Sequence, residues 1–146
     1  MDDHTYLSKD AKETQSIAAD IARKCHPGTT ICLYGNLGSG KTTFSKGFAK
    51  ALEISDNISS PTFVILKQYR FKENNILYHF DLYRLETTKD IENIGLTDIG
   101  KDKNGIILIE WAEKAKSILP KNRIDIYFEY IDENTRKIRI RSKNGK

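Results

Sequence analysis

Residues 29–43, TTICLYGNLGSGKTT, decide the fold of this chain. Their apolar and β-branched start, residues 29–34, predicts a short buried strand. A glycine-rich turn follows, and a helical pattern then runs from about residue 41 to residue 53. Residues 35–42 match the pattern G-x-x-x-x-G-K-[ST]. A strand, a glycine-rich loop and a helix in this order predict a phosphate-binding loop.

The residue types in this loop suit a polyphosphate. Backbone N–H groups can converge on phosphates only where the chain curls tightly, and glycine adopts the positive φ angles that this needs at low cost. The following helix presents free N–H groups and the positive end of its dipole. Lys41 adds a mobile charge, and the hydroxyl of Thr42 can bind Mg²⁺. The predicted nucleotide-binding residues are Gly35, Gly38, Ser39, Gly40, Lys41, Thr42 and Thr43.

Two carboxylates are candidates to complete the site, because each directly ends an apolar run. Glu110 follows residues 106–109, and Asp81 follows residues 76–80. Ligands of α/β sheets lie at the carboxyl ends of the strands, so we expect both side chains near the phosphate loop. We predict that Glu110 and Thr42 hold the metal ion and that Asp81 positions water. The alternative is that each acid is an ordinary surface carboxylate.

Two neighbours of these acids have two interpretations each. Trp111 follows Glu110 and is a candidate for the site, although a lone tryptophan is more often part of a core. His79 either flanks the site or is an ordinary polar residue on a strand. The predicted catalytic residues are Lys41, Asp81, Glu110 and Trp111.

The rest of the chain alternates expected helices and strands. We expect a helix at 8–25 capped by Ser8, a short helix at 87–95, a polar loop at 98–105 and a helix at 112–119. The expected strands are 62–71, 76–82, 105–110, 124–131 and 136–142, the first two joined by a turn at 74–75. This pattern predicts an α/β fold of the P-loop NTPase type, with a mixed parallel and antiparallel sheet flanked by helices in a single compact domain, residues 1–146.

Length and composition exclude several classes of protein. The chain has 146 residues, 38% hydrophobic residues and a formal net charge of +4, which argues against collagen, mucin or a long disordered chain. No apolar run reaches the roughly 20 residues that span a bilayer, and the polar N-terminus is not expected to be a secretory leader. Two cysteines, Cys25 and Cys32, in such a chain indicate a reducing compartment, so we expect the cytoplasm.

Basic residues become more frequent towards the C-terminus. On a strand, Lys137, Arg139 and Arg141 point one way, while Ile138 and Ile140 point the other. One interpretation is a solvated face whose charges discourage pairing at the edge of the sheet. The other is a contact surface for RNA phosphates.

Several classes of phosphate-loop protein are disfavoured by missing motifs. The chain has neither the N-K-x-D that reads guanine nor an L-S-G-G-Q-like stretch, and no arginine-rich lid is evident. These absences favour a small nucleotide hydrolase or switch whose output is a conformational change delivered to a partner. A small nucleoside or metabolite kinase is the alternative, and a non-enzymatic RNA-binding module is a third hypothesis. For the base of the nucleotide, Thr14 or a C-terminal arginine are candidates between which the sequence does not decide.

Five blocks in order carry a resemblance to a known family. They are residues 35–43, then Ser-Pro-Thr-Phe at 60–63, His-Phe-Asp-Leu-Tyr-Arg at 79–84, Glu-Trp-Ala-Glu at 110–113 and Leu-Pro at 119–120. Together they resemble the ordered motifs of the TsaE family, over roughly residues 14–131. The second and third blocks are specific, and with the phosphate loop they are hard to obtain from another class.

The resemblance implies a weak Mg²⁺-dependent ATPase with ATP and Mg²⁺ as cofactors. Such a protein docks on a two-subunit enzyme of the TsaB and TsaD type, which makes threonylcarbamoyladenosine next to the tRNA anticodon, and it supports repeated turnover. The family's metal ligands fall on Thr42 and Glu110, which agrees with the interpretation of the residues alone. The expected partner is the protein complex, with tRNA contacted indirectly and no membrane involved.

The resemblance also implies two switch segments, at 60–63 and 79–84. The expected switch residues are Ser60, Thr62, His79 and Asp81. A threonine such as Thr62 can sense a γ-phosphate through its hydroxyl, and loss of that phosphate would release both segments.

Overall fold

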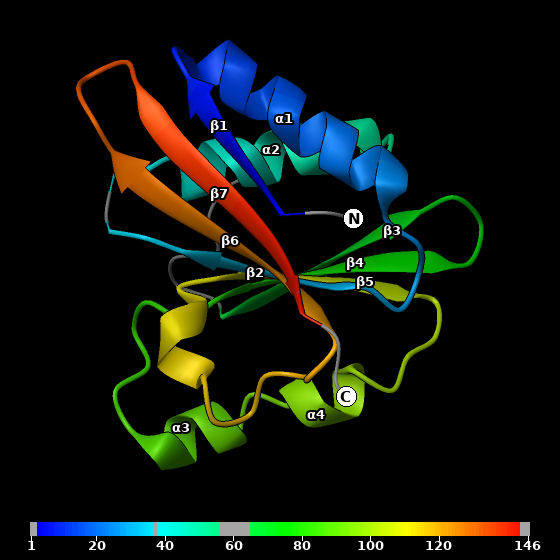
Figure 1. Cartoon of the computed structure of the whole chain (residues 1–146). Coiled ribbons are helices and arrows are strands. Elements are labelled where there is room, and N and C mark those ends of the chain that lie inside the picture. Colours follow the sequence, from blue (N-terminus) through cyan, green and yellow to red (C-terminus); the bar gives the residue numbers. More distant parts are fainter. Residues whose placement is uncertain (1–2, 37, 56–64, 144–146) are drawn as a thin grey trace.

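Four parallel strands form the centre of the sheet and carry the phosphate loop. The computed structural model describes residues 3–36, 38–55 and 65–143. In it β6 (Arg123–Tyr130), β2 (Thr30–Tyr34), β5 (Gly105–Glu110) and β4 (Asn75–Asp81) lie side by side and parallel. Antiparallel strands extend both sides, β7 (Arg136–Lys143) and β1 (His4–Ser8) beyond β6, and β3 (Leu66–Phe71) beyond β4. The order is β1-β7-β6-β2-β5-β4-β3, a single mixed sheet (Figure 1).

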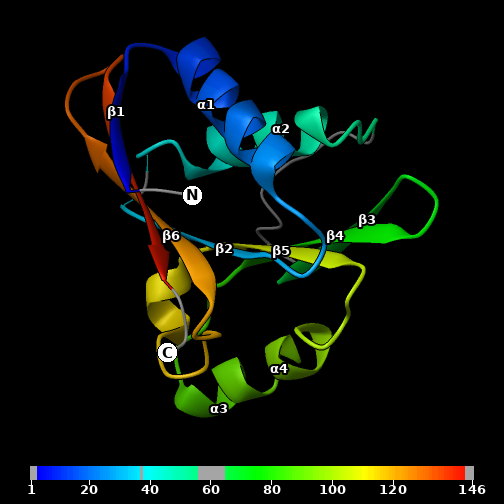
Figure 2. The same cartoon turned by 45° about the vertical axis from the view of Figure 1, so that its right-hand side comes forward.

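Helices cover both faces of this sheet. On one face lie α1 (Ala11–Lys24) and α2 (Lys41–Ala51), and on the other lie α3 (Thr88–Glu92), α4 (Leu96–Ile99) and the 3₁₀ helix η1 (Ala112–Ala115) (Figures 1 and 2). Each face has its own apolar cluster. Phe44 and Phe48 of α2 are buried in the first, and Leu82, Leu96 and Ala115 in the second. The α/β class and the mixed sheet flanked by helices are therefore confirmed.

The N-terminal segment differs from its prediction. Residues 4–8 form strand β1, which pairs with β7, and the helix begins only at Ala11. Asp10 rather than Ser8 caps it, since the Asp10 side chain accepts the N–H of Glu13 at 2.8 Å. Ser8 is buried and its hydroxyl contacts that of Thr14 at 2.7 Å. Five residues of mixed polarity carried too weak a pattern to be recognised as a strand.

Four smaller expectations also change. The turn between β3 and β4 uses residues 72–74, so Asn75 already lies in β4. The polar segment 98–105 contains the end of α4, and the expected helix at 112–119 is reduced to η1. Because β7 is paired with both β6 and β1, its basic face is not at the edge of the sheet, and its charges do not protect an edge.

Some predicted features fall where the structure gives no description. Ser60 and Thr62, with the rest of the 60–63 switch segment, lie outside the described residues. In the described part of the chain, no helix is long and apolar enough to cross a membrane.

Alanine at Gly47 should lower the free energy of unfolding by about 1–3 kcal/mol, the usual cost of overpacking. Its Cβ would lie 2.6 Å from both Cα and the carbonyl oxygen of Gln15, so α1 and α2 would have to separate. Helix propensity predicts the opposite, a gain of about 1 kcal/mol for alanine over glycine. Urea unfolding curves decide between overpacking and helix propensity. The control is Lys46→Ala, at an exposed position of the same helix. A Gly47→Ala protein as stable as its parent would contradict close helix packing.

Alkaline pH should destabilise the fold. Burial raises the pKa of Cys25 and of Cys32 from 9.0 to about 12. Unfolded thiols ionise near 9.0 while folded ones keep their protons, so the stabilisation is complete below pH 9.0 and is lost as pH rises towards about 12. We expect the urea midpoint to fall steadily over this range. In Cys25→Ala the urea midpoint should fall less steeply with pH. An equally steep fall would show that ionisation of the Cys25 thiol does not cause the loss of stability.

Candidate nucleotide site

The phosphate loop connects the end of β2 to the start of α2, as predicted. Gly40 has φ 106°, a left-handed conformation that favours glycine, and immediately precedes the helix. No side chain caps that helix start, so its first N–H groups are available to an anion. Gly35 tolerates no side chain, because a Cβ would lie 2.8 Å from both Phe128 O and Ser39 Oγ. Backbone geometry thus explains why the loop contains these glycines.

Glu110 is the best-connected acid beneath the loop. It is 1% exposed at the end of β5, and it accepts hydrogen bonds from the hydroxyls of Thr42 at 3.0 Å and Ser45 at 3.1 Å. The Nε2 of His79 lies 2.5 Å from its Oε2, within hydrogen-bond distance. Three side chains from α2 and β4 therefore fix this carboxylate. It is not a surface acid, so that alternative is wrong for Glu110.

Asp81 lies beside Glu110, because the two residues are directly paired in the register of β4 and β5. Its side chain is 8% exposed and accepts the N–H of Tyr83 at 3.0 Å. Asp81 also lines the cavity above the loop, where it faces Glu110 and Trp111. The expectation that the two strands bring both acids to one edge is confirmed. His79, in contrast, is 1% exposed and supports Glu110 from behind.

Lys41 is held by its surroundings on several sides. Its Nζ lies 3.3 Å from the ring centroid of Trp111 and donates to the carbonyl oxygen of Gly35. Burial lowers the pKa of Lys41, and the negative charges of Glu113, Glu110 and Asp81 oppose that decrease. Trp111 therefore contacts Lys41 and lines the cavity above the loop, and it also packs against the apolar cluster on the η1 side of the sheet.

Glu113 contributes a contact that the sequence did not predict. Its Oε2 accepts the N–H of Gly35 at 3.2 Å, while its Oε1 is buried with no hydrogen-bond partner in the described structure. Gly35 is thus held at its N–H by Glu113 and at its carbonyl by Lys41. The Glu-Trp-Ala-Glu block at 110–113 could have pointed to this contact, because Glu110 and Glu113 both contact residues of the phosphate loop.

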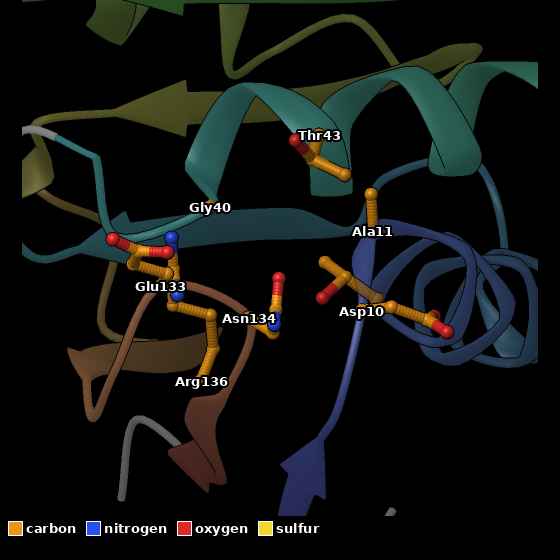
Figure 3. Close-up of a pocket in the computed structure, with 8 residues that line it drawn as sticks. Asp10, Ala11, Gly40, Thr43, Glu133, Asn134 and Arg136 are labelled. Carbon is orange, nitrogen blue, oxygen red and sulfur yellow. The ribbon is translucent and has the colours of Figure 1, made fainter.

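Two cavities meet at the loop. The larger, of about 400 Å³, is lined by residues 38–43 and by Asp81, Tyr83, Glu110, Trp111 and Arg136. The smaller, of about 200 Å³, lies between the starts of α1 and α2 and the β6–β7 turn. Figure 3 shows Asp10, Thr43 and Asn134 around this second cavity. Thr14 and Arg136 also line this cavity. Thr14 and a C-terminal arginine are the candidates that the sequence offered for contacting the base of the nucleotide.

Sequence reasoning missed two further parts of the site. Ser45 lies one helical turn after Lys41 and Thr42, on the side of α2 that faces Glu110, so its spacing was a usable signal. Arg136 reaches the loop from the other end of the chain, and its place in the alternation of β7 distinguishes it from Arg139 and Arg141.

Comparison with known proteins agrees with this geometry. The family model described as "Threonylcarbamoyl adenosine biosynthesis protein TsaE" matches residues 8–138, most of the chain. This chain belongs to the TsaE family. The match includes the phosphate loop, both acids and Arg136, so the resemblance inferred from five sequence blocks is confirmed.

Individual TsaE proteins match over most of their length. The tRNA threonylcarbamoyladenosine biosynthesis protein TsaE of Bacillus subtilis is 39% identical over 129 residues, covering 87% of this chain and 78% of the relative. The protein of the same name from Haemophilus influenzae is 37% identical, covering 79% and 73%. That from Treponema pallidum is 34% identical, covering 92% and 97%.

A solved crystal structure is also similar to this chain. The crystal structure of YdiB from Bacillus subtilis superposes with a TM-score of 0.82 at 31% sequence identity, covering 97% of this chain and 86% of that one. The overall fold is therefore shared with an experimentally determined structure.

Proposed function

We propose that this chain is a Mg²⁺-dependent ATPase that serves as a nucleotide-driven switch in tRNA threonylcarbamoyladenosine biosynthesis. Membership of the TsaE family supports the role in that pathway. The observation that carries the ATPase is the contact between Thr42 and Glu110 at 3.0 Å, directly below an uncapped helix start. A hydroxyl and a buried carboxylate at that place are the protein ligands that a phosphate-bound Mg²⁺ takes.

The two cavities suit the two halves of ATP. The triphosphate fits the larger one, where loop N–H groups and Lys41 meet the two acids. The nucleoside fits the smaller one, because that cavity continues past Thr43 and is bordered by polar groups of Asp10, Thr14 and Asn134. This arrangement supports the predicted nucleotide-binding residues from Gly35 to Thr43.

Each residue then has a defined task. Lys41 leaves its contact with Gly35 O and neutralises phosphate oxygens, while Trp111 limits where the ammonium group can go. Asp81 holds the attacking water, and Ser45 and His79 keep Glu110 oriented. Bound Mg²⁺ would supply charge stabilisation between Thr42 and Glu110.

The switch acts through the segment that follows Asp81. Tyr83 packs on Trp111 with ring centroids 4.9 Å apart, and the Lys114 ammonium donates to the carbonyls of Tyr83 and Leu85. Residues 81–85 therefore lie between the phosphate cavity and the surface, where a change at the γ-phosphate can reach a partner. We propose that this partner is a two-subunit complex of the TsaB and TsaD type in the cytoplasm, and that tRNA is contacted only through it.

Calorimetry and a coupled hydrolysis assay test this function. We expect Mg²⁺-dependent binding of ATP and ADP, slow hydrolysis by the chain alone and a changed rate with the two-subunit complex. Absence of Mg²⁺-dependent nucleotide binding, alone and in the complex, would refute the proposal. An acceptor-dependent burst of ADP in a screen of nucleosides and metabolites would favour the kinase alternative. Steep salt-dependent tRNA binding that ignores Mg-ATP would favour the RNA-binding module.

A further inference from the structure

Arg136 reaches the phosphate loop from the far end of the chain. Its Nε donates to the carbonyl oxygen of Gly38 at 3.0 Å, and its Nη1 donates to the carbonyls of Asp132 at 2.5 Å and Thr135 at 3.0 Å. Its guanidinium carbon lies 4.5 Å from the ring centroid of Tyr130. Three carbonyls and one aromatic ring therefore hold the guanidinium group in place before any ligand arrives.

Alternation along β7 explains this direction. Arg136 has the parity of Ile138 and Ile140, whose side chains are buried in the cluster under α1 and α2. Arg139 has the opposite parity, and its guanidinium lies over Tyr127, 4.9 Å from the ring centroid, away from the loop. This strand thus carries three arginines, of which Arg136 is the one that lines the cavities at the phosphate loop.

The contact with Gly38 O orients a peptide plane of the loop. In a trans peptide the N–H points opposite to the C=O, so holding the Gly38 carbonyl outward turns the Ser39 N–H inward. In the structure that N–H closes a turn on the carbonyl of Asn36 at 3.2 Å. Ser39 itself is buried, with 1% of its surface exposed.

Arg136 also lies at the boundary between the two cavities, since it lines both. Among the described residues, it and Lys41 are the cationic side chains of the phosphate cavity. Within the described part of the chain, the hydrogen bonds of Arg136 to protein atoms use its Nε and Nη1.

We propose that Arg136 is a nucleotide-positioning residue, which holds the apex of the phosphate loop from outside and adds a second cation where the phosphate and nucleoside cavities meet. This inference rests on the proposed nucleotide function. It assigns to the β6–β7 hairpin a direct part in binding, because the hairpin turn anchors the guanidinium group.

Calorimetric titration with Mg-ADP tests the proposal on the full chain. Arg136→Ala should weaken binding by about tenfold or more, the worth of a charge-assisted hydrogen bond. Arg136→Lys should recover only part of that loss, because lysine restores the charge without the planar fork. Arg139→Ala removes the same charge from the same strand and should bind within about twofold of the parent.

The outcomes separate this proposal from the proposed function and from a purely structural role. Binding by the parent and equally by Arg136→Ala would overturn the inference alone, whereas no binding by the parent would refute the nucleotide function itself. Full recovery in Arg136→Lys, or an equal loss in Arg139→Ala, would show that charge alone matters and would overturn the positioning role. Nucleotide-free melting temperatures are measured for each variant. If Arg136→Ala melts at a lower temperature than the parent, the Mg-ADP affinities of Arg136→Lys and Arg139→Ala decide whether Arg136 positions the nucleotide.

Discussion

Lys41→Ala should lower the rate of Mg-ATP hydrolysis by about a hundredfold or more, the loss seen when one preorganised donor to developing charge is removed, and should also weaken nucleotide binding. Lys41 is the residue whose ammonium group lies between Gly35 O, the Trp111 ring and three acids. Without it, Asp81, Glu110 and Glu113 face the incoming phosphates with no compensating charge from α2. The repulsion of like charges then adds to the lost hydrogen bonds.

The measurement compares calorimetric affinity for Mg-ADP with the hydrolysis rate in the presence of the partner complex. Lys46→Ala is the matched control, because it removes a lysine from the exposed side of the same helix. The fold should survive in Lys41→Ala, since burial of this ammonium group is itself costly and its removal relieves that cost. Hydrolysis at the parental rate in Lys41→Ala would place the reaction elsewhere on the molecule.

Glu110→Gln should reduce hydrolysis by about 10²–10³-fold, an effect of the size known for lost electrostatic stabilisation. Glutamine has nearly the same shape and keeps one oxygen, which can occupy the Oε2 position beside Ser45 and His79. It lacks the negative charge that a divalent cation requires. Mg²⁺ titrations of the nucleotide-bound protein should therefore show a weaker metal dependence.

Ser45→Ala is the control for this change, because it removes one hydrogen bond to Glu110 and leaves Thr42 in contact with the other oxygen. We expect a small loss for Ser45→Ala and a large one for Glu110→Gln. Equal metal dependence in parent and Glu110→Gln would assign the ion to another acid, of which Asp81 is the nearest along the sheet.

The local parts of the site could be predicted because their residues are contiguous. The loop at 35–43 lies in one segment, and each acid directly follows an apolar strand, so parallel pairing of β4 with β5 brought Asp81 to Glu110. Ser45 and Glu113 are also local, but their contacts depend on which way η1 and α2 turn. Trp111 has φ 60°, which ends β5 abruptly and directs the chain back towards the loop.

Long-range pairing accounts for what was missed. Strand β1 is recognisable only through its partner β7, because five residues of mixed polarity do not establish a period. Arg136 needed both the register of β7 and the position of Gly38, which are 98 residues apart in the chain. The basic run at the C-terminus therefore suggested one surface, whereas the fold divides it between two faces of a strand.

The nucleoside cavity is assembled from residues 10–14, 40–43 and 133–136, almost the full span of the polypeptide. A ribosome completes the glycine loop well before it supplies residues 133–136, which form the last wall of this cavity. A product that stops before residue 133 thus carries an intact phosphate-loop motif without this wall, and under the proposed function it would retain nucleotide less well than a chain that includes the β6–β7 hairpin.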